Sequence, residues 1–116
     1  MIIGQDNPVT QTLAATIGQF VEADYIVLNE GFEDQLQNVT VKPEFVFVNL
    51  MDVNDPRMVV KVVRSYFDNC ILVGIHAFDS DALIQEIYAM GYDRYLTVFN
   101  MATDLPTLLQ HSNPSN

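Results

Sequence analysis

Hydrophobic residues occur along this chain in five short runs, each of which is typical of a β-strand. The third and fourth runs are almost continuously hydrophobic, which is expected of parallel strands that are covered on both faces. The predicted strands are residues 1–4, 25–29, 45–50, 71–76 and 94–99.

Between these runs, hydrophobic residues recur every three or four positions and therefore fall on one face of a helix. The first helical stretch, residues 9–21, follows Pro8, and a broader stripe at residues 58–67 follows Pro56. Proline is well tolerated in the first turn of a helix, so both residues mark helix starts.

Three further helices are predicted. Residues 83–90 carry a hydrophobic stripe, with Ser80 as a candidate N-cap and Gly91 as a C-terminal stop. Residues 31–39 are short and polar, so they form a weak helix at best. The last stretch, 105–110, contains Pro106, which is tolerated only in a first turn, so we expect this helix to be short.

Strands and helices thus alternate five times within about 110 residues. Because consecutive parallel strands are joined by right-handed crossovers, this order predicts an α/β fold with a three-layer, doubly wound sheet. We expect one domain over residues 1–111. The polar residues 112–116 are expected to be a flexible tail or the start of a linker.

Composition fits a folded globular protein. Hydrophobic residues make up 49% and charged residues 17% of the 116 residues, and no hydrophobic stretch approaches the roughly 18 residues needed to span a bilayer. No signal peptide is visible, and Cys70 is the single cysteine, so no internal disulfide can form. We therefore expect a cytoplasmic protein without membrane association.

The chain is strongly acidic. Fifteen acidic residues against five basic ones give a formal net charge of −10. Such a surface repels phosphate backbones, and no cluster of lysine and arginine with interleaved aromatic residues is present. Direct binding to DNA or RNA is therefore not expected.

Asn49 stands at the carboxyl end of the third predicted strand, where parallel α/β sheets usually place their binding or catalytic groups. The loop after the first strand reads Gly-Gln-Asp-Asn-Pro-Val at residues 4–9. Before and along the fifth strand, residues 91–99 read Gly-Tyr-Asp-Arg-Tyr-Leu-Thr-Val-Phe. With these motifs the chain resembles a response-regulator receiver domain of bacterial two-component signalling. The resemblance covers essentially the whole chain and implies a flavodoxin-like sheet with strand order 2-1-3-4-5.

The resemblance also implies which positions correspond to the phosphorylation site of a receiver domain. The family's acidic pair corresponds to Gln5 and Asp6, its phosphoacceptor aspartate to Asn49, its Ser/Thr to His76, and its lysine to Val98. An amide cannot form an acyl phosphate, Mg²⁺ usually requires carboxylate ligands, and valine cannot pair with a phosphoryl group. These losses predict a degenerate pseudo-receiver that binds no metal and no cofactor.

Several residues near this position have two possible interpretations. Asp52 and Asp6 could rebuild a metal site on the same rim, or Asp52 could belong to an ordinary solvated loop in which Asp55 favours a helix start. His76 could titrate as a switch, or fill the space of the missing phosphoryl group with a hydrogen bond to backbone or to Asn49. Tyr95, at the family's switch-aromatic position, could change rotamer or be fixed by the bulk of His76.

The leading hypothesis is a non-enzymatic, phosphorylation-independent signalling or transcription-regulatory module that binds a protein partner or gates an attached output domain. By resemblance, its interaction face, which could also form a homodimer, would comprise the fourth helix, fifth strand and fifth helix. Its candidate residues are Tyr88, Tyr92, Arg94, Tyr95 and Phe99.

Two alternatives come from other functional classes. A small-molecule sensor would bind in the crevice at the strand ends lined by Gln5, Asp6, Asn49 and His76. Phosphotransfer through Asp52 is the third possibility. Glycine-rich phosphate loops, zinc-ligand spacing and a Gly-x-Ser-x-Gly elbow are all missing from the sequence.

Overall fold

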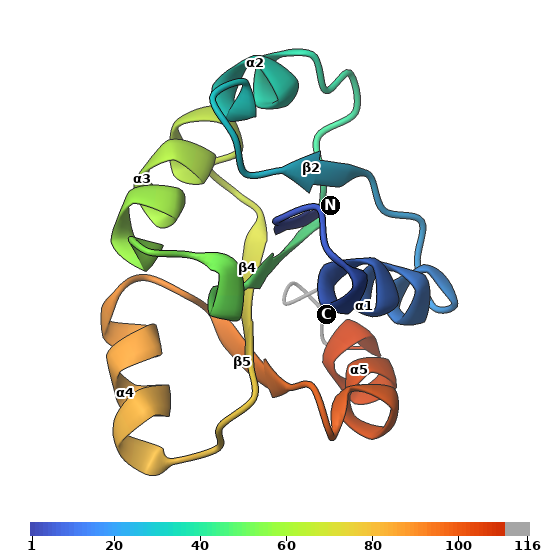
Figure 1. The fold of residues 1–116 in the computed structure, drawn as a ribbon, viewed down its shortest axis with the longest axis vertical. Coiled ribbons are helices and arrows are strands. Elements are labelled where there is room, and N and C mark those ends of the chain that lie inside the picture. The colour runs from blue at the N-terminus through green and yellow to red at the C-terminus, as the bar shows by residue number, and fades with distance from the viewer. Residues whose placement is uncertain (111–116) are drawn as a thin grey trace.

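The computed structural model of the protein describes residues 1–110. Five parallel strands form a single sheet in the order β2-β1-β3-β4-β5, which confirms the predicted flavodoxin-like α/β fold (Figure 1). The predicted tail or linker, residues 112–116, lies outside the described part of the chain, as does His111. The strands are β1 Ile2–Gly4, β2 Tyr25–Val27, β3 Phe45–Asn49, β4 Ile71–His76 and β5 Arg94–Thr97.

Helices cover both faces of the sheet. Two of them, α1 and α5, lie on one face, and α2, α3 and α4 lie on the other (Figure 1). A single 3₁₀ turn, η1, follows β3 directly. The helical elements are α1 Pro8–Gly18, α2 Phe32–Gln37, η1 Leu50–Asp52, α3 Pro56–Tyr66, α4 Asp81–Ala89 and α5 Met101–Gln110.

The sheet is buried because successive residues of each strand point to opposite faces and both faces carry hydrophobic side chains. In β3, Phe45 and Phe47 pack with α1 and α5, whereas Val46 and Val48 pack with α2, α3 and α4. All of these β3 side chains are buried. The sheet therefore divides the core into two hydrophobic clusters, and β3 is its central strand.

The helix starts follow the expected capping chemistry. The side chains of Asn7, Asp55 and Ser80 each accept a hydrogen bond from the backbone N–H three residues later, at the starts of α1, α3 and α4. The predicted roles of Ser80 and of Asp55 near a helix start are confirmed. Gly91 follows α4 with a φ of 109°, a conformation that favours glycine, so its role as a stop is also confirmed.

The end of the described chain differs from the prediction. Strand β5 ends at Thr97 and not at residue 99, so Val98 and Phe99 lie in the turn before α5. Helix α5 begins at Met101, four residues earlier than expected, because the carbonyl of Asn100 accepts from the N–H groups of Thr103 and Asp104.

Pro106 therefore lies inside α5 and not in its first turn, which corrects the prediction of a short last helix. Proline cannot donate the N–H that would bond to the carbonyl of Ala102. Ala102 is exposed, so its carbonyl can bond to water, which lowers the cost of the missing bond. Among residues 1–110, no helix has the length and hydrophobicity to cross a membrane.

Candidate functional site

Asp52 is the centre of a hydrogen-bond network at the carboxyl end of the sheet. Its Oδ2 accepts from the backbone N–H of Gln5 at 2.9 Å, from Thr10 Oγ1 at 2.5 Å and from Asn49 Nδ2 at 3.0 Å. Its Oδ1 accepts from Asn7 Nδ2 at 3.0 Å. Every donor is electrically neutral, and together they occupy both oxygens of the carboxylate.

Asn49 is the buried member of this network. Its side chain is 1% exposed, and its Nδ2 donates to Thr10 Oγ1 at 2.9 Å as well as to Asp52. Its Oδ1 accepts from the backbone N–H of Met51 at 3.2 Å, which caps η1. An amide supplies both donors and acceptor here, whereas an ionised carboxylate could only accept.

Thr10 joins helix α1 to the network and is fully buried although it is polar. Gly4 makes this possible, because a Cβ atom at Gly4 would lie 2.6 Å from Thr10 Cγ2. The hydroxyl of Thr10 accepts from Asn49 and donates to Asp52, so its hydrogen-bonding capacity is used in both directions. The network therefore connects the β1–α1 loop, α1, the end of β3 and η1.

The sequence correctly placed Asn49 at the end of the third strand, but it did not identify Thr10 and Asp52 as its partners, nor Asn7 as a further partner of Asp52. The contacts of Asp52 with Gln5, Asn7 and Thr10 span 42 to 47 positions along the chain. The sequence does contain a signal for Thr10: it is a polar residue on the inward face of the first helix, and Gly4 at the end of the preceding strand leaves room for it. For Asp52 the sequence suggested a metal ligand, part of a solvated loop or a phosphotransfer acceptor, but not a hydrogen-bond partner of Asn49.

The geometry argues against the rebuilt metal site. Asp6 is exposed and its Oδ1 accepts from Gln11 Nε2 at 2.9 Å, so it does not join the Asp52 network. Both oxygens of Asp52 already have protein donors. Within residues 1–110, no group of three or more histidine, cysteine, aspartate or glutamate side chains is arranged to hold a metal ion.

His76 lies at the end of β4 but makes no hydrogen bond to Asn49 or Asp6 in the described chain. Its Nδ1 accepts from the backbone N–H of Ala77 at 2.8 Å, and its ring packs against Phe78 in a tilted arrangement with centroids 5.2 Å apart. Burial lowers the pKa of the imidazole below its usual value. The predicted backbone hydrogen bond is present, and the neutral imidazole is the form that burial favours.

The four residues predicted to line a crevice differ in their surroundings. Asn49 is buried and fully hydrogen-bonded, while His76 packs with the β4–α4 loop. Gln5 joins the network through its backbone, and its carbonyl accepts from Tyr25 Oη at 2.5 Å. Gln5 lines a hollow of 310 Å³ at this rim together with Asp52, whereas the predicted crevice with Asp6, Asn49 and His76 stays a prediction.

The proposed interaction face needs one correction, at Tyr92. This side chain is only 3% exposed because it packs in the hydrophobic cluster with α3 and α4, where its hydroxyl donates to the carbonyl of Pro56 at 3.1 Å. Burial raises the pKa of its phenol above the usual range. Tyr92 is therefore part of the core and cannot contribute to an exposed binding face.

The other candidate residues of this face reach the surface to different extents. Tyr88 and Arg94 are exposed, and Phe99 is 81% exposed. Tyr95 is half-buried, and its hydroxyl donates to the carbonyl of Phe78, which favours one fixed position of the ring. Burial and the nearby charge of Asp79 raise the pKa of the Tyr95 phenol.

Comparisons with known proteins identify no relatives: no family model, curated protein sequence or solved structure matches this chain. The sheet order defines the class of fold as flavodoxin-like, and the network around Asp52 is its central polar feature. No family is assigned to the chain.

Proposed function

We propose that this chain is a phosphorylation-independent regulatory module, a pseudo-receiver that acts by binding another protein or an attached output domain. The observation that carries this proposal is the closed network of Asn49, Thr10 and Asp52. It occupies the strand-end position at which a receiver domain would need an accessible carboxylate and a divalent cation.

The chemistry of the network supports the absence of phosphotransfer. An aspartyl phosphate forms by attack of a free carboxylate oxygen, and the buried residue at the end of β3 is an amide. The carboxylate that is present, Asp52, accepts four hydrogen bonds, which reduce the availability of its oxygens for attack on phosphorus. Val98 supplies hydrocarbon at the position that the resemblance gives to a lysine.

The internal hydrogen bonds of the site support a role in contact and shape. The network ties the β1–α1 loop, α1 and η1 to the end of β3. A domain whose strand-end loops are held in this way presents a constant surface to a partner. The exposed side chains that we assign to the interaction face are Tyr88, Arg94 and Phe99, with the accessible part of Tyr95 beside them.

The full chain, immobilised as bait, should capture its partner equally well with and without prior treatment with acetyl phosphate and Mg²⁺. The captured protein is then purified and its affinity is measured by calorimetry. A Tyr88→Ala/Arg94→Ala variant should weaken this affinity by about tenfold or more, the scale of one interface hot spot.

The matched control is Arg57→Ala/Met58→Ala, which removes an exposed arginine and an exposed large side chain from α3. This control should bind like the wild type. A partner that binds only after acetyl phosphate treatment would contradict phosphorylation independence. Equal losses in both variants would contradict the choice of face.

A further inference from the structure

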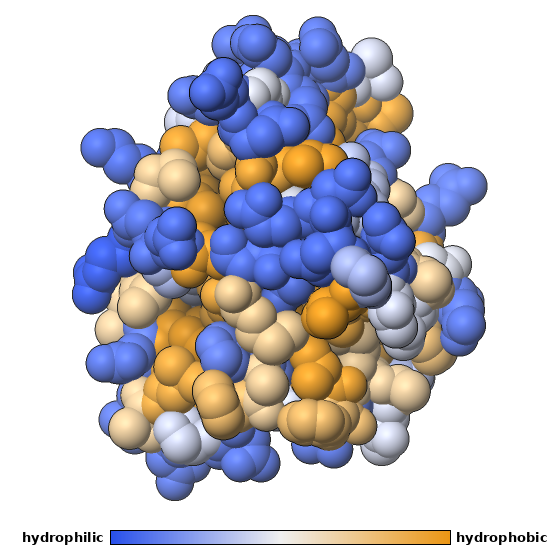
Figure 2. All heavy atoms as spheres, in the orientation of Figure 1, coloured by the Kyte–Doolittle hydropathy of each residue, from blue (hydrophilic) through white to orange (hydrophobic). Residues whose placement is uncertain are grey.

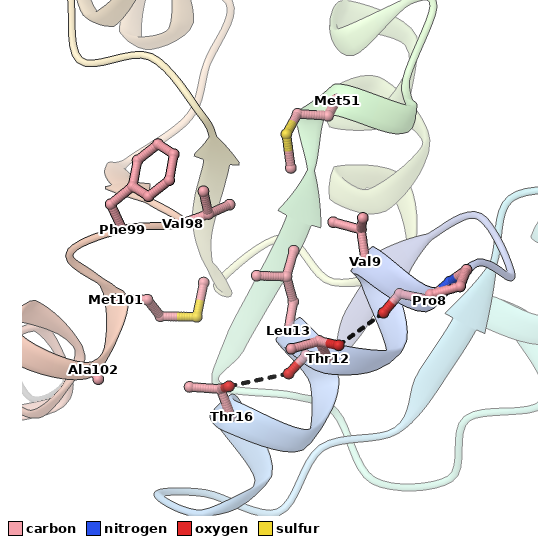
Figure 3. Close-up of a pocket in the computed structure, with 10 residues that line it drawn as sticks. All are labelled: Pro8, Val9, Thr12, Leu13, Thr16, Met51, Val98, Phe99, Met101 and Ala102. Carbon is pink, nitrogen blue, oxygen red and sulfur yellow. Dashed lines mark hydrogen bonds between the residues drawn. The ribbon is translucent and has the colours of Figure 1, made fainter.

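A hollow of 490 Å³ lies between helices α1 and α5, and its lining is mainly hydrophobic (Figure 3). Side chains of α1 form one wall, the turn after β5 and the start of α5 form the other, and Met51 closes one end. The lining residues are Pro8, Val9, Thr12, Leu13, Thr16, Met51, Val98, Phe99, Met101 and Ala102.

The floor of the hollow is part of the core, and its rim is exposed to solvent. Leu13 and Met101 are buried beneath it, whereas Val9 is 52% and Phe99 is 81% exposed. Met51 is also exposed. In the orientation of Figure 1, hydrophobic side chains gather on the lower half of the molecular surface, beneath a hydrophilic band (Figure 2). Large hydrophobic side chains that surround one concave surface are a sign of a binding site.

The polar side chains among the described lining residues are those of Thr12 and Thr16. Thr12 Oγ1 donates to the carbonyl of Pro8 at 2.9 Å, and Thr16 Oγ1 donates to the carbonyl of Thr12 at 3.0 Å (Figure 3). Both protons are therefore used within α1, and the oxygen lone pairs remain available as acceptors. The lining contains no charged side chain, although the whole chain carries a net charge of −10.

We propose that this hollow binds a small, uncharged, hydrophobic molecule that presents at most one or two hydrogen-bond donors to Thr12 and Thr16. The volume lies within the range of roughly 300–1,000 Å³ that is typical of small-molecule sites. An ionic ligand would lose its hydration without finding a partner charge. Met51 and Met101 supply flexible side chains that adapt to the shape of a ligand.

A second copy of the chain fits this site less well than a small molecule. Two molecules of net charge −10 repel each other, and the lining offers no basic side chain to offset that repulsion. The proposal adds a ligand to the regulatory module described above. It does not depend on that function, because a hydrophobic molecule can bind here whether or not the protein has a protein partner.

The structure also indicates how a bound molecule could influence the rest of the domain. Met51, on the rim, donates its backbone N–H to Asn49 Oδ1, and Thr10 lies on α1 between Val9 and Leu13. The lining and the Asp52 network thus share α1 and η1. Binding should therefore shift the side-chain amide resonance of Asn49 in NMR spectra, in addition to the methyl resonances of the lining.

The test uses N-phenyl-1-naphthylamine, an uncharged probe whose fluorescence rises in hydrophobic surroundings. Ala102→Trp fills the hollow from α5, and Ala82→Trp makes the same change at an exposed position of α4 outside the lining. We expect saturable binding to the wild type and to Ala82→Trp, with methyl shifts centred on Val9, Leu13 and Val98. We expect binding about tenfold weaker or worse for Ala102→Trp.

A second variant decides the result if Ala102→Trp fails to fold. Val9→Asp places a charge on the rim, and an acidic residue in the first turn of α1 is favourable for the helix. It should weaken probe binding and leave the fold intact. The proposal is overturned by non-saturable binding, by equal affinities of the pocket and control variants, or by binding that appears only when the protein self-associates in sedimentation experiments.

Discussion

Asn49 and Thr10 are joined by a buried hydrogen bond of 2.9 Å, from the amide at the end of β3 to a hydroxyl on α1. Each residue also donates to the same oxygen of Asp52. This arrangement gives a carboxylate, an amide and a hydroxyl complementary roles. It explains why an amide is suited to the end of this strand: the position requires a donor, and an ionised acid provides none.

Removal of the shared acceptor should destabilise the fold. Asp52→Ala leaves Thr10 Oγ1 and Asn49 Nδ2 without their common partner and also frees the donors of Gln5 and Asn7. Buried polar groups that lose a partner cost about 1–3 kcal/mol, so we expect a loss of about 2–3 kcal/mol in the free energy of unfolding. Urea denaturation followed by circular dichroism measures this loss.

The control for this prediction is Asp6→Ala, because Asp6 bonds to Gln11 at the exposed surface. Its effect should stay within about 0.5 kcal/mol. If both variants have the same stability, Asp52 does not organise the network in solution.

Restoration of a carboxylate at the end of β3 should destabilise the protein in a pH-dependent way. Asn49→Asp removes two N–H donors and places a second acid beside Asp52. Repulsion and burial raise the folded-state pKa of the introduced carboxyl above its unfolded value of about 3.9. The folded state therefore favours the protonated acid. The loss of stability relative to wild type grows as the pH rises above the unfolded-state pKa of about 3.9.

We expect a loss of about 3 kcal/mol near pH 7 and a smaller one near pH 4, from urea denaturation at both pH values. Asn54→Asp is the control, since Asn54 is exposed and the chemical change is identical. A loss that is independent of pH would show that the introduced acid ionises freely.

Tyr92 should determine part of the stability at alkaline pH. Burial raises its folded-state pKa, whereas the unfolded chain releases the phenolic proton near pH ~10. Its contribution is fully present below that pH and is lost as the pH rises above it. Tyr92→Phe should cost about 1 kcal/mol at pH 7, through loss of the bond to Pro56, and should reduce the decline of stability above pH ~10.

Denaturation midpoints at pH 7 and at alkaline pH test this prediction. The exposed Tyr88, changed to phenylalanine, should leave both the midpoint and its pH dependence nearly unchanged. Identical alkaline profiles for the two variants would place Tyr92 at the surface.

Two glycines provide a further matched test of the backbone. Gly91 has a φ of 109°, and a Cβ there would lie 2.9 Å from Val60 Cγ1, so Gly91→Ala should cost about 1–3 kcal/mol. Gly18, at the end of α1, has open space around it, and Gly18→Ala should be neutral or stabilising by about 0.5 kcal/mol. Thermal unfolding of both variants separates these effects, and a neutral Gly91→Ala would contradict the strained turn.

The sequence was sufficient to predict the sheet because local hydrophobic pattern and buried position coincide there. The run around Phe47 and the run around Val73 are hydrophobic on both faces, and both became central strands. The same reasoning extended β5 too far. Val98 and Phe99 continue the hydrophobic run, but they line a surface hollow beyond the last strand residue.

The errors at Tyr92 and Pro106 have different physical origins. Tyr92 is buried by packing against residues from distant parts of the chain, and its hydroxyl bonds to Pro56, 36 positions away; no local sequence pattern predicts such contacts. For α5, the spacing of Met101, Leu105 and Leu108 already indicated a longer helix. An interior proline is compatible with this helix because the packing of α5 against the sheet can offset one lost hydrogen bond at an exposed turn.

The central claim is that the Asn49–Thr10–Asp52 network closes the strand-end site to phosphoryl chemistry. The most direct measurement is a two-dimensional NMR titration of the full chain with Mg²⁺ and beryllofluoride, which mimics a phosphoryl group. The account predicts no saturable shift in the signals of Gln5, Asn49 and Asp52. Saturable shifts at these three residues, with both ions required, would contradict it.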